Sequence, residues 1–353
     1  MPARGIGGLP MTITVERFTG SPPDWDTFVL AADGATHCHL WGWKSIVERE
    51  LGHECIYLAA RSSDGQLAGV LPIVRVQSRL FGHYLISMPF LNAGGPLGEE
   101  RAVQQLVDRA VELAEGQRVD LLELRSTKPR PLDLPVSHRK ITVVLDLPAQ
   151  QPRRLWDGLA AKVRNQVRKT LKEGISVRFG RDQLGAFFEV FSRHMRDLGT
   201  PTQARGLFEA IADTFPAGDV WFGCAYLGPR AIAAGCGFRW GTAFEMTWAS
   251  ALAAYKTSAA NMLLYWAFLE RATEAGLQVF DFGRCTPGSR THRFKRQWGG
   301  VDVPLWWYQR VAGQRAATPS PDDRAFSWGP RLWKRLPLPI ANLLGPRVVR
   351  LIP

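Results

Sequence analysis

Two stretches of the chain repeat the same order of helix, glycine and strand, and this repeat restricts the fold more than any other sequence feature. In each stretch a helical segment stops at a glycine, an apolar run follows, and arginine and threonine stand at its end. The stretches are Asp108–Thr127, ending in Arg125-Ser126-Thr127, and Glu270–Thr286, ending in Arg284-Cys285-Thr286. Upstream, Gln66–Arg75 and Pro229–Arg239 each read as a strand after a turn. The sequence therefore predicts a duplicated α/β unit.

A length of 353 residues also exceeds what one small core needs and favours two domains. We expect a first domain at residues 11–150, a second at 151–312 and a tail at 313–353. With 46% hydrophobic and 22% charged residues, the chain has the composition of a globular protein.

Cellular location and bound groups are constrained by what the sequence lacks. No apolar run approaches the roughly 20 residues of a membrane span, and the N-terminus lacks the pattern of a signal peptide, so a cytoplasmic protein is expected. The five cysteines are odd in number and scattered, which predicts reduced thiols. His37 and His39 have no accompanying ligand pair, so a zinc site is not expected. No bound cofactor is expected either.

The net charge of +12 indicates anionic partners, namely nucleic acid, membrane lipid or phosphate-bearing small molecules. One basic segment is a predicted connecting helix at 153–174, whose apolar residues recur every fourth position. A second is the tail from Arg324 to Pro353, which mixes cations with tryptophan and leucine and contains no acidic residue. This tail predicts a peripheral anchor on an anionic membrane, with packing onto the second domain as the alternative. Its prolines favour short pieces over one continuous helix.

Past the second repeated strand, an acid, an arginine, a hydroxyl and a lysine occur close together. Phe280-Asp281-Phe282-Gly283 is followed by Arg284, Thr286 and the run Phe294-Lys295-Arg296-Gln297-Trp298-Gly299. Loops at strand ends are where α/β folds place binding groups.

These motifs, together with Trp248-Ala249-Ser250 and the run from Asn261 to Trp266, resemble the second half of FemAB-related acyltransferases. The resemblance is strongest to the branch associated with PEP-CTERM and exopolysaccharide systems, and it extends from about Trp25 to the C-terminus. It implies an α/β (α+β) fold of tandem GNAT-like acyltransferase domains with a cleft between them. The implied enzyme is an N-acyltransferase that transfers an acyl or aminoacyl group to an amine of a cell-envelope precursor or an exopolysaccharide amino sugar.

The resemblance leaves the donor open among acyl-CoA, acyl carrier protein and aminoacyl-tRNA. FemAB enzymes that use aminoacyl-tRNA carry a long helical arm, and the short helical stretch Gln203–Phe215 argues against a tRNA donor here.

Transfer to an amine requires a proton acceptor, a stabilised oxyanion and oriented reactants. Asp281 is the candidate acceptor or ammonium ligand, and Arg284 or Lys295 would supply positive charge to the oxyanion or to phosphates. The alternative is that Asp281 and Arg284 form a structural ion pair at the strand exit.

Further residues are candidate substrate contacts. The resemblance implies that Lys162, Arg164 and Asn165 contact phosphate, with an ordinary solvated helix face as the alternative. It also implies that the loop with Asn92, Gly94 and Gly95 lines the acceptor cleft, with a plain turn as the alternative. The remaining candidates are Trp248, Ser250, Asn261, Tyr265, Thr286, Phe294 and Trp298. Asn261 could instead cap its helix, whereas Tyr265, Phe294 and Trp298 could instead pack in the core. A catalytic triad at Ser250 and a catalytic thiol at Cys285 are disfavoured, since neither has an activating neighbour in the sequence.

A function of another class is a non-catalytic, membrane-surface assembly factor for polysaccharide export built on an acyltransferase fold. It predicts that function does not depend on Asp281, Arg284 or Lys295. A nucleic-acid-binding module ranks last, because no zinc-finger or RNA-recognition signature accompanies the basic charge.

Overall fold

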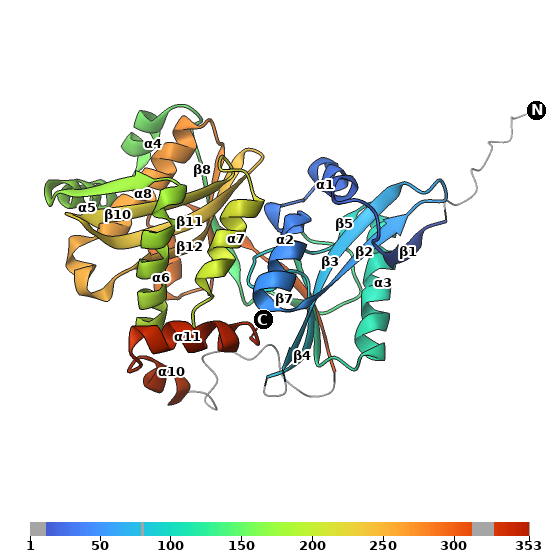
Figure 1. The fold of residues 1–353 in the computed structure, drawn as a ribbon. Helices are drawn as coiled ribbons and strands as arrows, with labels where there is room; N and C mark the ends of the chain where they lie inside the picture. Colours follow the sequence, from blue (N-terminus) through green and yellow to red (C-terminus); the bar gives the residue numbers. More distant parts are fainter. Residues whose placement is uncertain (1–11, 79–80, 313–327, 353) are drawn as a thin grey trace, which may run out of the picture. The chain divides into compact units, whose positions relative to one another are not determined.

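The computed structural model describes residues 12–78, 81–312 and 328–352. The chain forms two compact units (Figure 1). The first comprises Met1–Trp43, His53–Val136 and Trp306–Ala317, and the second Lys44–Gly52, Ser137–Leu305 and Thr318–Pro353.

The first unit is built on a mixed sheet with the order β1-β2-β3-β4-β6-β15-β7, and β5 pairs with β3. Its strands are β1 (Thr14–Arg17), β2 (Glu54–Arg61), β3 (Leu67–Ser78), β4 (Gly82–Ile86), β5 (Leu97–Gly98), β6 (Leu121–Ser126), β7 (Val136–Ser137) and β15 (Trp306–Val311). Its helices are α1 (Pro22–Ala31), η1 (His37–His39) and α3 (Glu100–Gly116), while α2 (Gly42–Ile46) begins in this unit. The apolar face of α3, which includes Leu106 and Val107, is buried with the sheet residues in one core.

The second unit is built on a sheet with the order β14-β8-β13-β12-β11-β10-β9. Its strands are β8 (Ile141–Asp146), β9 (Ile175–Phe179), β10 (Val220–Leu227), β11 (Arg230–Trp240), β12 (Ala243–Ala251), β13 (Val279–Cys285) and β14 (Val301–Pro304). Its helices are η2 (Val47–Leu51), α4 (Pro152–Gly158), α5 (Ala161–Lys172), η3 (Arg181–Gln183), α6 (Leu184–Leu198), α7 (Arg205–Thr214), η4 (Ala253–Ser258), α8 (Ala260–Glu274), α9 (Arg290–Arg296), α10 (Trp328–Trp333) and α11 (Leu338–Val349). Helix α8 is buried on most sides, because the sheet and α5 both pack against it.

The two sheets have the same strand order when one is read from the opposite end. In each, three antiparallel strands lead to a parallel pair, β4 with β6 and β12 with β13, and one helix, α3 or α8, connects the parallel strands. The echoed triplets begin at the ends of the equivalent strands β6 and β13, and the upstream echoes fall on the equivalent strands β3 and β11. The predicted duplication and the α+β fold class are therefore confirmed.

Each sheet also contains a strand that lies outside the boundaries expected from the sequence. β8 precedes residue 150 but pairs with β13 in the second sheet, whereas β15 precedes residue 312 but pairs with β6 in the first. The units thus divide near residues 136 and 305 rather than at 150 and 312. The last strand of each repeat therefore joins the sheet of the other repeat. Local sequence patterns do not specify which sheet a strand joins.

The predicted connecting helix at 153–174 is two helices, α4 and α5, separated at Leu159 and Ala160. Leu155, Leu159, Val163 and Val167 of its apolar stripe are buried, as a helical stripe facing a core should be, but Leu171 is 52% exposed.

Candidate active site

The parallel strands β12 and β13 pair only along their first three residues. Ala243, Phe244 and Glu245 stand opposite Val279, Phe280 and Asp281, although β12 continues to Ala251 and β13 to Cys285. Beyond this point the described residues contain no further register pair between the two strands. The sheet is therefore open on the C-terminal side of Glu245 and Asp281.

A β-bulge in β13 lies directly after Asp281. The register with β8 passes from Asp281 opposite Val144 to Arg284 opposite Thr142, so β13 holds one extra residue. Gly283 adopts φ +74° there, and a Cβ at this position would lie 2.5 Å from the carbonyl oxygen of Met246. Only glycine fits both the backbone conformation and the space.

Asp281 stabilises this bulge through one carboxylate oxygen. Its Oδ1 accepts hydrogen bonds from the backbone N–H of Gly283, at 2.7 Å, and from the hydroxyl of Thr142. No donor among the described residues contacts the other oxygen, Oδ2. One oxygen therefore fixes the side chain while the second can exchange a proton.

Lys295 stabilises the same bulge by binding backbone carbonyl groups of β13. Its side chain, on α9, is 4% exposed, and Nζ donates to the carbonyl oxygens of Gly283 at 2.6 Å and Arg284 at 2.9 Å. Burial lowers the pKa of Lys295, and the nearby Cys285 and Asp281 oppose that shift. Two of its three donors are thus engaged with backbone.

Glu245 is the residue directly opposite Asp281 in the parallel pair. Burial and, after it, the charge of Glu245 raise the pKa of Asp281, while the hydrogen bonds from Thr142 and Gly283 and the charge of Lys295 lower it. The net pKa of Asp281 is about 7. Asp281 can therefore change its protonation state near neutral pH.

The position in the first unit that is equivalent to Asp281 is Glu123, and the residue opposite it is apolar. Glu123 stands opposite Ile86 in the parallel pair of β4 and β6, and its carboxylate is fully buried. The guanidinium of Arg125 contacts Glu123 at 2.7 Å, and Gln309 donates to it at 2.6 Å. In the first unit the carboxylate is neutralised by a cation, as a buried charge requires. In the second unit a second acid takes the place of Ile86.

The structural alternative for Asp281 and Arg284 was an ion pair between them. None of the ion pairs among the described residues joins these two side chains. Arg284 is partly buried at the strand exit, and Thr286 accepts a hydrogen bond from Lys140 at 2.8 Å. Burial raises the pKa of the Cys285 thiol, and a thiol in this state is a poor nucleophile.

Three other candidates belong to an aromatic cluster next to the bulge. Tyr265 stacks on Phe282 with 5.8 Å between ring centroids, and it lies edge to face with Phe294 at 4.9 Å. Trp298 is 1% exposed and contacts the same rings. Burial also raises the pKa of Tyr265. These side chains pack around β13 and hold α9 in place, as the packing alternative for them predicted.

Trp248 and Ser250 lie further along β12. Trp248 is half-buried and packs edge to face on Phe208 of α7, at 5.2 Å. Ser250 is buried opposite Ala234 of β11. Asn261 lies in the first turn of α8, but the N-cap is Ala259, in the left-handed conformation, and no side chain caps this helix. The capping role considered for Asn261 is therefore wrong.

The basic candidates of α5 lie on a helix that packs against α8. Arg164 donates to the carbonyl oxygen of Asp157 at 2.7 Å, which closes the end of α4. Lys162 and Asn165 are exposed. Within the described residues, no hydrogen bond of these three side chains reaches β13.

The candidates Asn92, Gly94 and Gly95 belong to a loop of the first unit. Met88 and Phe90 in this loop adopt φ values of +57° and +71°, which non-glycine residues rarely do. Arg125 holds the loop by donating to the carbonyl oxygen of Leu91 at 2.9 Å.

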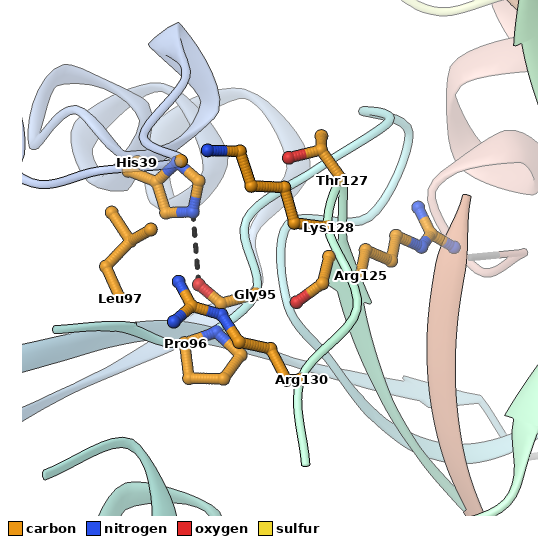
Figure 2. A pocket seen from close by; sticks show the side chains of 10 residues that line it. His39, Gly95, Pro96, Leu97, Arg125, Thr127, Lys128 and Arg130 are labelled. Carbon is orange, nitrogen blue, oxygen red and sulfur yellow. Dashed lines mark hydrogen bonds between the residues drawn. The ribbon is translucent and has the colours of Figure 1, made fainter. Parts of the chain in front are cut away.

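Figure 2 shows the pocket beside this loop. It is lined by residues that include His39, Gly95, Ser126, Lys128 and Arg130. His39 Nε2 donates to the carbonyl oxygen of Gly95 at 3.0 Å, and burial lowers the pKa of His39 to about 4, so the imidazole is neutral. The side chain of Arg125 points away from the pocket (Figure 2).

Sequence reasoning missed Glu245 and Thr142. Glu245 was detectable as the one charged residue of a mostly apolar and aromatic run, Ala243–Trp248. Thr142 had no such signal, because its role depends on β8 joining the second sheet.

Comparisons with known proteins agree with this fold. Residues 159–296 match the sequence model of the acetyltransferase (GNAT) domain. No curated protein sequence matches the chain. The crystal structure of FemX is similar, with a TM-score of 0.62 at 14% identity, covering 85% of this chain and 98% of FemX. L-PGS from Bacillus licheniformis gives a TM-score of 0.53 at 12% identity over 94% of this chain and 97% of its own.

A tandem GNAT protein from the clavulanic acid biosynthesis pathway gives a TM-score of 0.53 at 13% identity, covering 87% of this chain and all of that protein. At such identities the similarity concerns the fold alone. The chain therefore has the fold of tandem GNAT proteins, and its second half carries the GNAT domain match.

Proposed function

We propose that the protein is an N-acyltransferase whose reaction takes place in the second unit, where β12 and β13 stop pairing. The observation that carries this proposal is Asp281, a carboxyl with a pKa of about 7 placed at the opening of a GNAT-type sheet. A general base works best when its pKa lies near the pH at which it acts. Asp281 would accept the proton that the acceptor amine loses as it attacks the acyl carbonyl.

The other residues of the site would position Asp281 and the reactants. Thr142 and the N–H of Gly283 hold Asp281 Oδ1, and Oδ2 would take up the proton of the amine. Lys295 fixes the bulge, and its third N–H and its charge would stabilise an oxyanion nearby. The amine gains the acyl group, the bond from the acyl carbon to the donor breaks, and the proton passes through Asp281 toward the leaving group.

A phosphate-bearing donor is supported by the start of α8. The first turn of α8 has no side-chain cap, and the exposed Lys256 lies just before it. Backbone N–H groups at a helix N-terminus favour phosphate oxygens. The longest described helix, α3, has 17 residues, so the described part of the chain has no long helical arm, and we favour acyl-CoA or acyl carrier protein over aminoacyl-tRNA.

The acceptor we propose is an amine on a cell-envelope precursor or an exopolysaccharide amino sugar, with the PEP-CTERM-associated branch resting on the motifs from Trp248 to Gly299. The free cysteines support a reaction in the cytoplasm, where thiols stay reduced.

The test is a mass shift on defined acceptors. The purified protein would be incubated with acyl-CoA, acyl carrier protein or aminoacyl-tRNA donors, and with amino-sugar or peptidoglycan-precursor acceptors. We expect an acyl mass added with one donor class, and loss of that product in Asp281→Asn. Asp213→Asn, the same change in an exposed ion pair with Arg181, is the matched control and should be active. No product with any donor would favour the assembly factor, whereas full activity of Asp281→Asn would mean that another group takes the amine proton.

A further inference from the structure

The C-terminal helix α11 has its large aliphatic residues on the opposite side from what a docked helix needs. Its inward face consists of Ala341, Gly345 and Val349, spaced four residues apart and buried. Its outward face carries Ile340, Leu343 and Leu344, of which Leu343 is 62% exposed. A helix that only covers a core places large aliphatic residues inward and polar residues outward.

The inward face is firmly held on the second unit. A Cβ at Gly345 would lie 2.9 Å from the backbone of Thr202, so the helix approaches this segment closely. Arg196 of α6 donates to the carbonyl oxygen of Leu336 at 3.1 Å, just before the helix. Contrary to the expectation from its prolines, α11 continues through Pro346 as one 12-residue helix. The apolar outward face is therefore presented by a fixed element.

Cations surround this apolar face. Leu332 of α10 is 56% exposed, and Arg331, Lys334 and Arg335 beside it are exposed as well. Arg347 lies on α11 three residues after Leu344, and residues 324–353 include no acid. Figure 1 shows α10 and α11 in red, next to the end of α6. We call the exposed residues of α10 and α11 the C-terminal patch.

We infer that the C-terminal patch binds the surface of an anionic lipid bilayer, with Leu332, Ile340, Leu343 and Leu344 entering the headgroup boundary. Aliphatic side chains gain from leaving water there, while cations around them are attracted to anionic headgroups. None of the helices in the described residues is long and apolar enough to cross a bilayer, so the contact is peripheral.

Two other occupants fit the patch less well. A second copy of the chain, related by two-fold symmetry, would bring the same cluster of cations against itself. Single-stranded nucleic acid is bound mainly by aromatic stacking, whereas the exposed apolar residues here are aliphatic. The lipid surface alone matches both the charge and the aliphatic character.

Vesicle sedimentation tests this inference. The full-length protein would be mixed with vesicles of phosphatidylcholine containing phosphatidylglycerol, or with phosphatidylcholine alone, at low and high salt. We expect pelleting with the anionic vesicles that weakens with salt. The variant Ile340→Ser/Leu343→Ser/Leu344→Ser should bind at least about tenfold more weakly, and each of Lys334→Glu and Arg335→Glu should cost roughly fivefold or more.

The matched control changes three exposed aliphatic residues elsewhere, as Leu30→Ser/Leu227→Ser/Val301→Ser. It should pellet like the unchanged protein. Because the three patch positions are exposed, the patch variant should keep its thermal midpoint, and acyl transfer to a soluble acceptor should continue. Absence of anionic-vesicle binding, equal binding of both triple variants, or a dimer that only the patch variant loses would overturn the inference.

Discussion

At the scale of single residues, Asp281 is where a change should be most visible in activity. Asp281→Asn keeps the shape and the acceptor oxygen for Gly283 and Thr142 but removes the base. We expect kcat/KM for acyl transfer to fall roughly 10²- to 10⁴-fold. For the unchanged enzyme, kcat/KM should rise with pH up to about 7 and then level, because Asp281 acts when ionised. A variant profile with the same inflection would assign that inflection to another group.

The raised pKa of Asp281 also predicts how stability depends on pH, and this dependence runs opposite to that of most carboxylates. Between pH 3.8 and about 7 the folded protein holds a proton on Asp281 that the unfolded chain releases. The free energy of unfolding therefore falls as pH rises through this window and is level above it. Asp281→Asn removes this loss, so at pH 8 the variant should be more stable by on the order of 1 to 3 kcal/mol.

The measurement is urea unfolding of both proteins at pH 4.5 and pH 8. The difference between them should be small at pH 4.5 and larger at pH 8. A difference that is the same at both pH values would show that Asp281 is ionised throughout.

Replacement of Lys295 should lower both the stability of the protein and the rate of acyl transfer. Lys295→Met keeps the apolar stem but leaves the carbonyl oxygens of Gly283 and Arg284 without their donor, which should cost about 2 kcal/mol in the free energy of unfolding. Loss of the charge should also lower kcat/KM by roughly 100-fold. Lys295→Arg should restore little, since a planar guanidinium does not fit a site shaped around an ammonium.

Lys172→Met, an exposed lysine on α5, is the control for Lys295 and should leave stability and rate unchanged. Near-normal turnover of a folded Lys295→Met protein would show that the lysine serves the bulge and not the reaction.

At the scale of elements, the bulge in β13 can be tested by two glycine substitutions with the same backbone conformation. Gly283 and Gly288 both have φ +74°, but of the two only Gly283 would bring a Cβ within 4 Å of other atoms, the nearest being the carbonyl oxygen of Met246. Gly288→Ala should cost about 1 kcal/mol from the backbone alone. Gly283→Ala should cost at least about 2 kcal/mol more and abolish transfer, because the strand must shift. Equal costs in urea unfolding would mean that β13 has room to relax.

Most elements of the site follow from local sequence, but their connections do not. The strand at Val279–Phe282 and the helix from Asn261 onward are predicted by apolar pattern and turn residues, and the structure contains them as β13 and α8. Gly283, which the sequence predicts to end this strand, instead lies in a bulge inside β13, which continues to Cys285. The pairing of Glu245 with Asp281, and the binding of Lys295 to backbone carbonyls, depend on strand register and on the docking of α9. Register and docking are tertiary properties that no local pattern specifies.

At the scale of the whole molecule, the repeat is visible in the sequence, whereas the exchange of its last strands is not. Trp307 and Tyr308 of β15 are buried in the first unit. The guanidinium carbon of Arg125 lies 4.4 Å from the centre of the Trp307 ring. Gln309 completes the hydrogen bonding of the buried Glu123. A sheet that is missing this strand would leave the Glu123–Arg125 pair poorly covered, and a buried pair that loses a partner costs several kcal/mol.

Folding of the first unit should therefore depend on residues far along the chain. We predict that a chain ending at residue 305 loses the fold of the first unit, although residues 12–136 remain, whereas a chain ending at residue 312 keeps it. Both truncations lack the C-terminal patch, so their difference reports on β15 alone. Hydrogen exchange of β2, β3 and β6 is the measurement, because amides in an intact sheet exchange slowly. Equal protection of these strands in the two truncated chains would mean that the first sheet is stable without its exchanged strand.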